Sequence, residues 1–382
     1  MIERSSITGI ARGYGSKVTV GVIGSHSALD VLDGASQEGL PSITVTQKGR
    51  DASYTRYFRK VDSGGTTRGV VDGVMRLDKF SDIMKPGNRR SLREKNTVFV
   101  PNRSFSSYCT LREIEDVFDV PIFGSRFLLR SEEREEKDNY YTLLEKGGLP
   151  YPQQIKDPSD IDSLVIVKLH HKVKKLERGF FTAASFEEYT NKARELVKSN
   201  VISEEDLSVA RIEKYIIGPV FNLDFFYSPL QEKGEKIELL GIDWRFESSL
   251  DGHVRLPAEQ QLSLSGEQRI PEYTVVGHNS ATLRESLLDG AFQLAEKYVD
   301  VAGKTHPPGI IGPFTLQTCV DKDMHFYIYD VAPRIGGGTN VHAWVGHSYG
   351  NMLYNCNMST GRRIALELGR GAKEERLEEL VT

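Results

Sequence analysis

The last third of the chain contains two side chains whose oxygens could bind a metal ion. A glycine-rich turn follows them. Gln317 falls in one predicted strand and Asp330 in the next, so both could face one cleft across a hairpin. Mg²⁺ prefers a few protein oxygens together with phosphates and waters. The turn from Pro333 to Asn340 contains three consecutive glycines, which permit close backbone approach to a ligand, and Arg334 and Asn340 add a guanidinium and an amide. This set predicts a metal and phosphoryl-transfer site. The alternative is a flexible turn beside an exposed edge residue.

Three polar loops follow the predicted strands of the first third. Gly24 to Ala28 opens a helix, where unpaired N–H groups and the helix dipole favour an anion such as phosphate. Lys48 to Asp51 and Asn102 to Phe105 follow the next two strands, at the carboxyl ends where open α/β sheets bind ligands. Because three such loops are adjacent, we favour an anion site over simple helix capping by Ser25 or Ser27.

Lys168 ends a predicted strand in the middle third, where it could neutralise nucleotide phosphates. A basic loop from His170 to Lys175 follows it, and then Arg178 to Phe181. A solvated basic hairpin is the alternative reading of this charge run. The two adjacent histidines point to opposite faces of an extended segment, so they argue only weakly for zinc.

The elements that must position these residues divide the chain into three parts. The first part has strands at 17–24, 41–47 and 96–101 and a helix over 28–39, which is typical of a small doubly wound domain. A domain boundary is expected near residue 125. The middle part has strands at 164–169, 178–183 and 210–217 and a helix over 185–199. The last part has strands at 221–228, 237–246, 313–320 and 325–331 and a long helix over 282–301.

The composition is that of an ordinary globular protein, with 39% hydrophobic and 27% charged residues over 382 positions. A formal net charge of -4 gives no general attraction to nucleic acid. The three cysteines are far apart and suggest neither a disulfide framework nor a metal knuckle, so a reducing cytoplasm fits best. The apolar runs are too short to span a bilayer, and the N-terminus lacks an apolar signal core. We expect a cytoplasmic protein that binds neither nucleic acid nor membranes.

Seven motifs, taken in order, are similar to those of one known family. They are Gly24-Ser25-His26-Ser27, Lys48-Gly49-Arg50-Asp51, Arg178-Gly179-Phe180-Phe181, Tyr227-Ser228-Pro229-Leu230, Leu283-Arg284-Glu285-Ser286-Leu287-Leu288, Pro308-Gly309-Ile310-Ile311-Gly312-Pro313-Phe314 and Gly337-Gly338-Thr339-Asn340. The chain resembles the archaeal formate-dependent ligases of purine synthesis, the 5-formaminoimidazole-4-carboxamide ribonucleotide (FAICAR) synthetases of the PurP type. The resemblance covers nearly the whole chain and is more specific than any single glycine-rich loop.

The resemblance implies an α/β protein of the ATP-grasp fold with an N-terminal doubly wound domain. Its parts would be an N-terminal substrate-binding domain over residues 1–125, a lid domain over 126–210 and a catalytic domain over 211–382. The implied reaction joins formate to the amine of aminoimidazole carboxamide ribonucleotide (AICAR) through formyl phosphate, releasing ADP and phosphate. The implied cofactors are ATP and Mg²⁺ or Mn²⁺, and a homo-oligomer, a trimer or a hexamer, is expected.

The resemblance also assigns roles to single residues. Gln317 and Asp330 would hold the metal, and the catalytic side chains would be Arg334, Lys168 and Asn340. The side chains expected to contact AICAR are His26, Ser27, Lys48, Arg50, Asp51, Ser104, and either His278 or Asn279. Those expected to contact ATP are Lys137, Lys168, Arg178, Glu213 and Glu247.

Four departures from the family's usual pattern cluster in the predicted site. A basic loop replaces a glycine-rich cradle before Arg178, and Gly277-His278-Asn279 stands where Gly-Asn is usual. Asn102-Arg103 stands where His-Gly is common, and Asp330 where Glu is common. Two alternatives therefore stay open. One is a ligase of the same architecture for another amine or carboxylate, and the other is a catalytically silent nucleotide-binding regulator.

Overall fold

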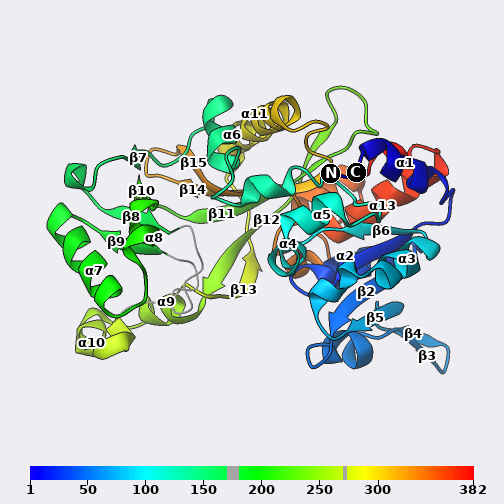
Figure 1. The fold of residues 1–382 in the computed structure, drawn as a ribbon, viewed down its shortest axis with the longest axis horizontal. Coiled ribbons are helices and arrows are strands. Elements are labelled where there is room, and N and C mark those ends of the chain that lie inside the picture. The colour runs from blue at the N-terminus through cyan, green and yellow to red at the C-terminus, as the bar shows by residue number, and fades with distance from the viewer. Residues whose placement is uncertain (170–179, 270–272) are drawn as a thin grey trace.

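A parallel four-stranded sheet in the order β5-β2-β1-β6 forms the N-terminal lobe of the computed structural model, which describes residues 1–169, 180–269 and 273–382 (Figure 1). Its strands are β1 (Thr19–Ile23), β2 (Ser42–Gln47), β5 (Gly73–Leu77) and β6 (Thr97–Val100). One face packs on α1 (Arg4–Arg12), α2 (Ala28–Gln37) and α13 (Thr360–Lys373), and the other on α3 (Pro86–Glu94), α4 (Arg103–Tyr108) and α5 (Leu111–Asp116). The predicted strand-turn-helix start of this lobe is confirmed.

The last helix, α13, packs against α2 although the two are more than 300 residues apart in sequence. A Cβ atom on Gly34 would lie 2.2 Å from the backbone nitrogen of Arg362, so this close approach requires glycine. The Gly361 N–H donates to Asp30 Oδ2 at 2.9 Å. The two ends of the chain lie side by side (Figure 1), and the core of this lobe extends beyond the predicted 1–125 range.

The second sheet, in the order β7-β10-β8-β9, belongs to the lobe at the left of Figure 1. It contains β7 (Gln154–Ile155), β8 (Val165–Lys168), β9 (Phe180–Ala183) and β10 (Arg211–Lys214), accompanied by α7 (Phe186–Lys198) and α8 (Glu204–Ser208). Val165, Val167 and Ile212 form its small apolar core. Because side chains alternate along a strand, Lys168 and Glu213 lie on the opposite face.

The third sheet is antiparallel, in the order β13-β12-β11-β14-β15, and joins the two lobes (Figure 1). Its strands are β11 (Val220–Tyr227), β12 (Ile237–Glu247), β13 (Val275–Ser280), β14 (Gly312–Val320) and β15 (Phe326–Ala332). Its apolar face packs on α6 (Tyr140–Lys146) and α11 (Leu288–Thr305), with Phe225 and Phe314 at the centre. The opposite face carries polar side chains from all five strands.

The remaining elements are short and mostly peripheral. They are β3 (Val61–Ser63), β4 (Thr66–Arg68), α9 (Ser248–His253), α10 (Ala258–Ser263), α12 (Ser348–Tyr354), the π-helical turn η1 (Ser53–Tyr57), and the 3₁₀ turns η2 (Phe80–Met84), η3 (Leu129–Glu132), η4 (Pro158–Asp160), η5 (Gly266–Arg269), η6 (Glu285–Leu287), η7 (Thr339–His342) and η8 (Leu377–Glu379). No helix in the three described ranges has the length and apolar character to cross a membrane. Cys109, Cys319 and Cys356 are free thiols.

A buried ion network fixes α13 to the third sheet. Arg363 donates to both carboxylate oxygens of Glu238 on β12, at 2.8 and 2.9 Å, and to Glu367 one turn further along α13 at 2.8 Å. Ser228 Oγ donates to the second oxygen of Glu367 at 2.5 Å, and the Arg363 guanidinium lies 4.2 Å from the ring centre of Phe226. Two carboxylates and one cation are thus buried together at the junction of two sheets.

Replacing this cation should destabilise the protein strongly. We expect Arg363→Met to lower the free energy of unfolding by about 3–5 kcal/mol, because it leaves two buried carboxylates without their cation. Arg370→Met, on the same helix but in a partly exposed pair with Glu374, is the matched control and should cost about 1 kcal/mol or less. Urea unfolding measures both losses, and equal losses would contradict a special role for Arg363.

Candidate active site

A row of polar side chains crosses the third sheet on the face away from α11. The directly paired residues are Asp330 with Gln317, Gln317 with Asn222, and Asn222 with Asp243. Residues paired on neighbouring strands point to the same face. Gln317 Oε1 is buried and lacks a hydrogen-bond partner among the described residues. The two predicted metal ligands, Gln317 and Asp330, are therefore neighbours on one surface.

Two buried carboxyls, Asp243 at the end of this row and Asp224 next to it, interact electrostatically. Thr315 donates to Asp224 Oδ1 at 2.7 Å, and Asn222 donates to Asp243 Oδ1 at 2.8 Å. Burial raises the pKa of both carboxyls, and that of Asp224 well above its ordinary value. In Asp243 the charge of the nearby His278 and the hydrogen bond from Asn222 partly oppose the effect of burial.

The turn from Gly336 to Gly338 rests directly on this carboxyl pair. A Cβ atom on Gly336 would lie 2.8 Å from Asp224 Oδ1, and one on Gly338 would lie 2.2 Å from Asp243 Oδ1. A Cβ atom on Gly337 would instead meet His26 Nδ1 at 3.5 Å, which is ordinary contact. Gly336, which lies over Thr315 Oγ1 at 2.5 Å as well as Asp224, and Gly338 thus have no room for a side chain, so the triplet is more than a flexible turn.

Hydrogen bonds hold the glycine turn against the loop after β1. Ser27 Oγ donates to the carbonyl of Gly336. Asn340 Nδ2 donates to the carbonyl of His26 at 2.7 Å, and Asn340 Oδ1 accepts from the Asp30 N–H at 3.0 Å. Asn340 thus caps the N-terminus of α2 from a distant part of the chain. Its catalytic role stays a prediction.

The loops after β1, β2 and β6 meet at one edge of the parallel sheet, as their positions in the sequence predicted. Asn102 donates to the carbonyl of Ser25 at 2.9 Å and so connects two of these loops. The Tyr54 ring, in the turn after β2, packs on Gly24, where a Cβ atom would lie 2.8 Å from the ring. Ser104 is buried in the first turn of α4.

Lys48, Arg50 and Asp51 lie at the same edge, and each has a partner within the protein. Lys48 forms an exposed ion pair, Arg50 donates to the hydroxyl of Tyr108 at 2.7 Å, and Asp51 lies 2.6 Å from Arg76 Nε. The structure thus holds all three in the loop after β2 through partners in the N-terminal lobe. Contact between them and a substrate stays a prediction.

Four cations act electrostatically on Asp330. Arg103 comes from the loop after β6, Arg134 from the segment before α6, Lys168 from β8 and Arg245 from β12. All three large sheets or their loops therefore bring positive charge to one carboxylate. Such an arrangement suits a polyphosphate bound with a metal ion.

Arg334 lies buried at the end of β15 and is engaged by protein groups. Its Nη2 atom pairs with Glu132 Oε1, and its Nη1 atom donates to the carbonyl of Ile335 at 2.7 Å. Glu132 also lies 3.5 Å from Arg103 Nη1, so it holds cations from two loops. The predicted contact of Arg334 with phosphoryl oxygens stays a prediction.

Lys168 and Glu213 form a buried ion pair, with 2.6 Å between Nζ and Oε2. Lys168 Nζ also donates to the hydroxyl of Tyr141 at 2.7 Å. Burial lowers the pKa of Lys168, although Glu213 opposes this shift. Burial also disfavours the charge on Glu213, but Lys168 and Arg211 outweigh it and lower the pKa of this carboxyl. The contacts with Glu213 and Tyr141 therefore fix the Lys168 side chain in place.

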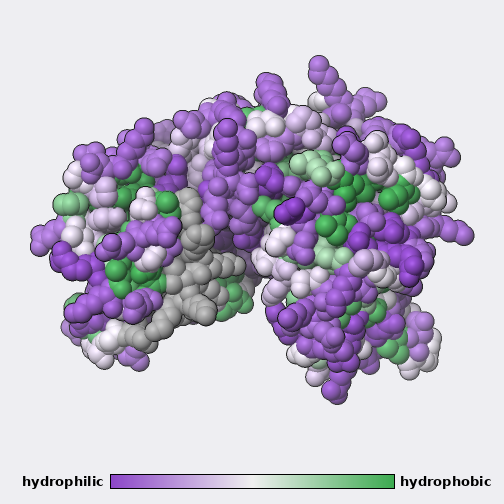
Figure 2. All heavy atoms as spheres, in the orientation of Figure 1, coloured by the Kyte–Doolittle hydropathy of each residue, from purple (hydrophilic) through white to green (hydrophobic). Residues whose placement is uncertain are grey.

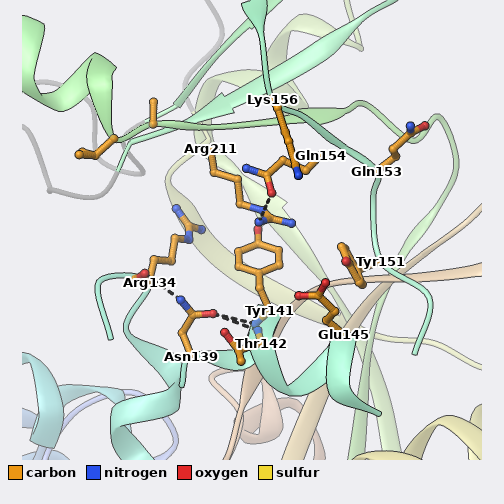
Figure 3. Close-up of a pocket in the computed structure, with 12 residues that line it drawn as sticks. Arg134, Asn139, Tyr141, Thr142, Glu145, Tyr151, Gln153, Gln154, Lys156 and Arg211 are labelled. Carbon is orange, nitrogen blue, oxygen red and sulfur yellow. Dashed lines mark hydrogen bonds between the residues drawn. The ribbon is translucent and has the colours of Figure 1, made fainter. Parts of the chain in front are cut away.

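A cavity of 490 Å³ is lined by Arg211 and Tyr141, which contact this ion pair (Figure 3). Arg211 lies over the Tyr141 ring, 3.8 Å from its centre, and its Nε atom lies 2.5 Å from Glu213 Oε1. Arg134 and Lys156 add positive charge to the lining. Lys168 and Glu213 are both predicted ATP ligands. Lys168 contacts Tyr141 and Glu213 contacts Arg211, and these two partners line the basic cavity.

Strand alternation distinguishes His278 from Asn279 on β13. His278 pairs with Arg245 and Asn279 with Trp244, so the two side chains point to opposite faces. Arg245 Nη2 donates to Asn222 Oδ1 at 3.4 Å, which places Arg245, and with it His278, on the face of the polar row. Of the two predicted AICAR ligands, the structure brings His278 to the site and points Asn279 away from it.

The other predicted ATP ligands are more widely spread. Glu247 ends β12, and Lys137 is exposed before α6. Arg178 and the predicted basic loop lie outside the described residues.

The surface is hollowed between the lobe of the second sheet and the N-terminal lobe (Figure 2), on the side where the loops of the parallel sheet face the third sheet.

Comparison with known proteins identifies the family. Residues 188–382 match a domain of unknown function (DUF1297), and residues 20–155 match a protein of unknown function (DUF1246). The chain is 38% identical over 382 residues to the 5-formaminoimidazole-4-carboxamide-1-(beta)-D-ribofuranosyl 5'-monophosphate synthetase of Methanothermobacter thermautotrophicus, covering 100% of this chain and 99% of the relative. It is 36% identical over 384 residues to the enzyme of the same name from Methanocaldococcus jannaschii, covering 100% of both. The chain belongs to the FAICAR synthetase family.

Solved structures agree with this family assignment. The crystal structure of an IMP biosynthesis protein PurP from Thermococcus kodakaraensis superimposes with a TM-score of 0.69 at 29% identity, covering 95% of this chain and 100% of that one. Biotin carboxylase from Campylobacter jejuni, at 13% identity and a TM-score of 0.57, covers 92% of this chain and 70% of that chain and shows a shared fold only. The predicted ATP-grasp fold is confirmed.

Several site residues of this family member were not predicted from the sequence. Arg134 lies in a densely charged stretch that gives no positional signal. Asn222 and Asp224 alternate with buried apolar residues on β11, and Asp243 and Arg245 do so on β12. This alternation marks one face as polar and could have revealed them.

The glycine turn supplies a direct test of this packing. We expect Gly338→Ala to lower the free energy of unfolding by about 1–3 kcal/mol, because its Cβ atom would displace the buried, hydrogen-bonded Asp243 carboxylate. Gly337→Ala is the matched control, and its cost should be smaller because its Cβ atom makes only ordinary contact. Denaturant unfolding compares the two variants, and an equal or larger loss for Gly337→Ala would refute the proposed packing.

Proposed function

We propose that the chain is an ATP- and formate-dependent ligase that converts AICAR to FAICAR and releases ADP and phosphate in purine synthesis. The observation that carries this proposal is the 38% identity over the full chain to a synthetase named for that product. The charges around Asp330 support it, because the reaction must hold a nucleotide polyphosphate beside a small carboxylate. Assembly into a homo-oligomer, the three domain ranges and a cytoplasmic location are proposed on the family resemblance.

Gln317 and Asp330 fit a divalent metal ion, which we propose is Mg²⁺ or Mn²⁺. Gln317 Oε1 is a buried oxygen that lacks a partner within the described ranges, and Asp330 adds a carboxylate directly across the hairpin. No three His, Cys, Asp or Glu side chains gather as a metal cluster in the part of the chain that the structure describes. A site with few protein oxygens suits Mg²⁺, which keeps waters and phosphates as ligands. When bound, the ion would neutralise charge on the transferring phosphoryl group.

The proposed chemistry has two steps. A formate oxygen attacks the γ-phosphorus of ATP and forms formyl phosphate and ADP, which activates a carboxylate that is otherwise a poor electrophile. Lys168, held in place by Glu213, and Arg334 would bind the phosphoryl oxygens. The AICAR amine then attacks the formyl carbon, and phosphate leaves. AICAR would bind at the loop edge that contains His26 and Ser104, next to the glycine turn.

A product assay tests the proposed function. Purified protein is incubated with Mg-ATP, formate and AICAR, and FAICAR is measured by chromatography and mass spectrometry alongside ADP. We expect FAICAR and ADP in equal amounts, and neither without formate. ADP release with another acid or amine but no FAICAR would instead identify a ligase with a different substrate. AICAR or ATP binding without ADP release under any condition would identify a nucleotide-binding regulator.

Asp330 supplies a site-directed test of the metal proposal. We expect Asp330→Asn to lower the rate of FAICAR formation by about 100-fold or more, because metal-assisted charge stabilisation contributes several kcal/mol. AICAR binding, measured by calorimetry, should persist. Asp323→Asn, at the exposed turn of the same hairpin, is the control and should keep full activity. Unchanged turnover in Asp330→Asn would rule out the metal role.

A further inference from the structure

The second step of the proposed reaction needs a proton acceptor. The attacking amine carries hydrogens, and forming its bond to the formyl carbon makes the nitrogen positively charged until one proton leaves. A histidine that faces the reacting groups is suited to this transfer near neutral pH. His278 is the candidate, because β13 directs it to the same face as the polar row that begins at Asp330.

His278 lies beside a buried carboxylate. Its Nε2 atom is 3.9 Å from Asp243 Oδ1, and its side chain is 19% exposed whereas that of Asp243 is fully buried. Asn222 also holds Asp243 in place, through the hydrogen bond at 2.8 Å. A buried carboxylate at this distance acts on an imidazole through its charge and stabilises the protonated form of the ring.

The glycine turn places this pair next to the proposed substrate edge. Gly338 lies on the Asp243 carboxylate, and its neighbour Gly337 lies on the His26 ring of the β1 loop. The Asp243 carboxylate and the glycine turn thus connect His278 to the β1 loop that would bind AICAR. No bulkier turn would allow such an approach, because a side chain at Gly338 would occupy the space of the carboxylate.

We propose that His278, oriented by Asp243, takes the proton from the attacking amine of AICAR; this inference rests on the proposed function. The amine nitrogen forms a bond to the formyl carbon of formyl phosphate, and one N–H proton passes to the imidazole. The bond between the formyl carbon and the phosphate oxygen then breaks, and phosphate leaves with the electron pair. His278 releases its proton to solvent before the next turnover. His278 is the catalytic residue, and Asp243 is a positioning residue.

Other charged and titratable groups share this environment. Arg245 is paired with His278 in the sheet, and its positive charge opposes protonation of the imidazole. His342, in the η7 turn next to β13, is close to Ser280, with 3.3 Å between Nε2 and the hydroxyl. Burial lowers the pKa of His342 to about 3, so it is neutral across the range in which an ordinary histidine titrates.

The test separates the two chemical steps in the wild-type protein and in His278→Gln. Formyl phosphate is trapped with hydroxylamine as the hydroxamate, and FAICAR is measured in parallel over a range of pH. We expect His278→Gln to lose about 100-fold or more in FAICAR formation while hydroxamate formation changes less than about threefold. The acid limb of the pH profile of FAICAR formation should disappear. His325→Gln, which removes an exposed histidine paired with Asp321, is the control and should leave both rates unchanged.

Asp243→Asn tests the positioning residue. Without the negative charge the imidazole should lose its proton more easily, so the acid limb should move to lower pH, and FAICAR formation should fall by a smaller factor than in His278→Gln. A His278→Gln protein that makes FAICAR at near wild-type rate, or that loses hydroxamate and FAICAR formation equally, would overturn the proton-acceptor role. Wild-type protein that makes no FAICAR would overturn the proposed function, and the inference with it.

Discussion

Contact between the glycine turn and the Asp224–Asp243 carboxyl pair is the constraint on which the rest of the site depends. The turn can lie this close only without side chains at Gly336 and Gly338, and burial raises the pKa of both carboxyls beneath it. Once placed, the turn accepts a hydrogen bond from Ser27 through the carbonyl of Gly336. The loops of the parallel sheet and the polar face of the third sheet are thereby held against each other.

Positive charge is the second organising feature. The chain has a formal net charge of -4, yet cations from β8, β12 and the start of α4 act on Asp330. Two of these cations have carboxylate partners of their own, Arg103 with Glu133 and Lys168 with Glu213. Burying such charges without partners would be costly, so the acidic residues hold the basic ones in position until a ligand arrives. The local arrangement of these cations, and not the net charge of the chain, suits the protein to bind an anionic ligand.

The predictions from sequence succeeded where the signal was local. Gln317 and Asp330 lie on two predicted strands that pair as expected, but a β-bulge between Gln317 and Thr318, which the sequence did not show, sets Asp330 opposite Gln317. Lys168 was found as the last residue of an apolar strand. The strands β5 and β13 were missed, because their residues are mostly half-buried or exposed and lack a clear apolar pattern. The start of α11 was placed six residues early, since a 3₁₀ turn and irregular backbone precede Leu288.

The sequence by itself determined the family, the order of most strands and helices, and the types of residue available for metal and phosphate binding, because these depend on motifs and short-range periodicity. Only the tertiary structure decided which side chains meet. It made Asn340 a cap for a helix more than 300 residues away, turned His278 toward the site and Asn279 away, and placed Asp243 beneath Gly338. These relations depend on the packing of distant strands and on strand register, and a one-residue change of register would reverse the faces of β13.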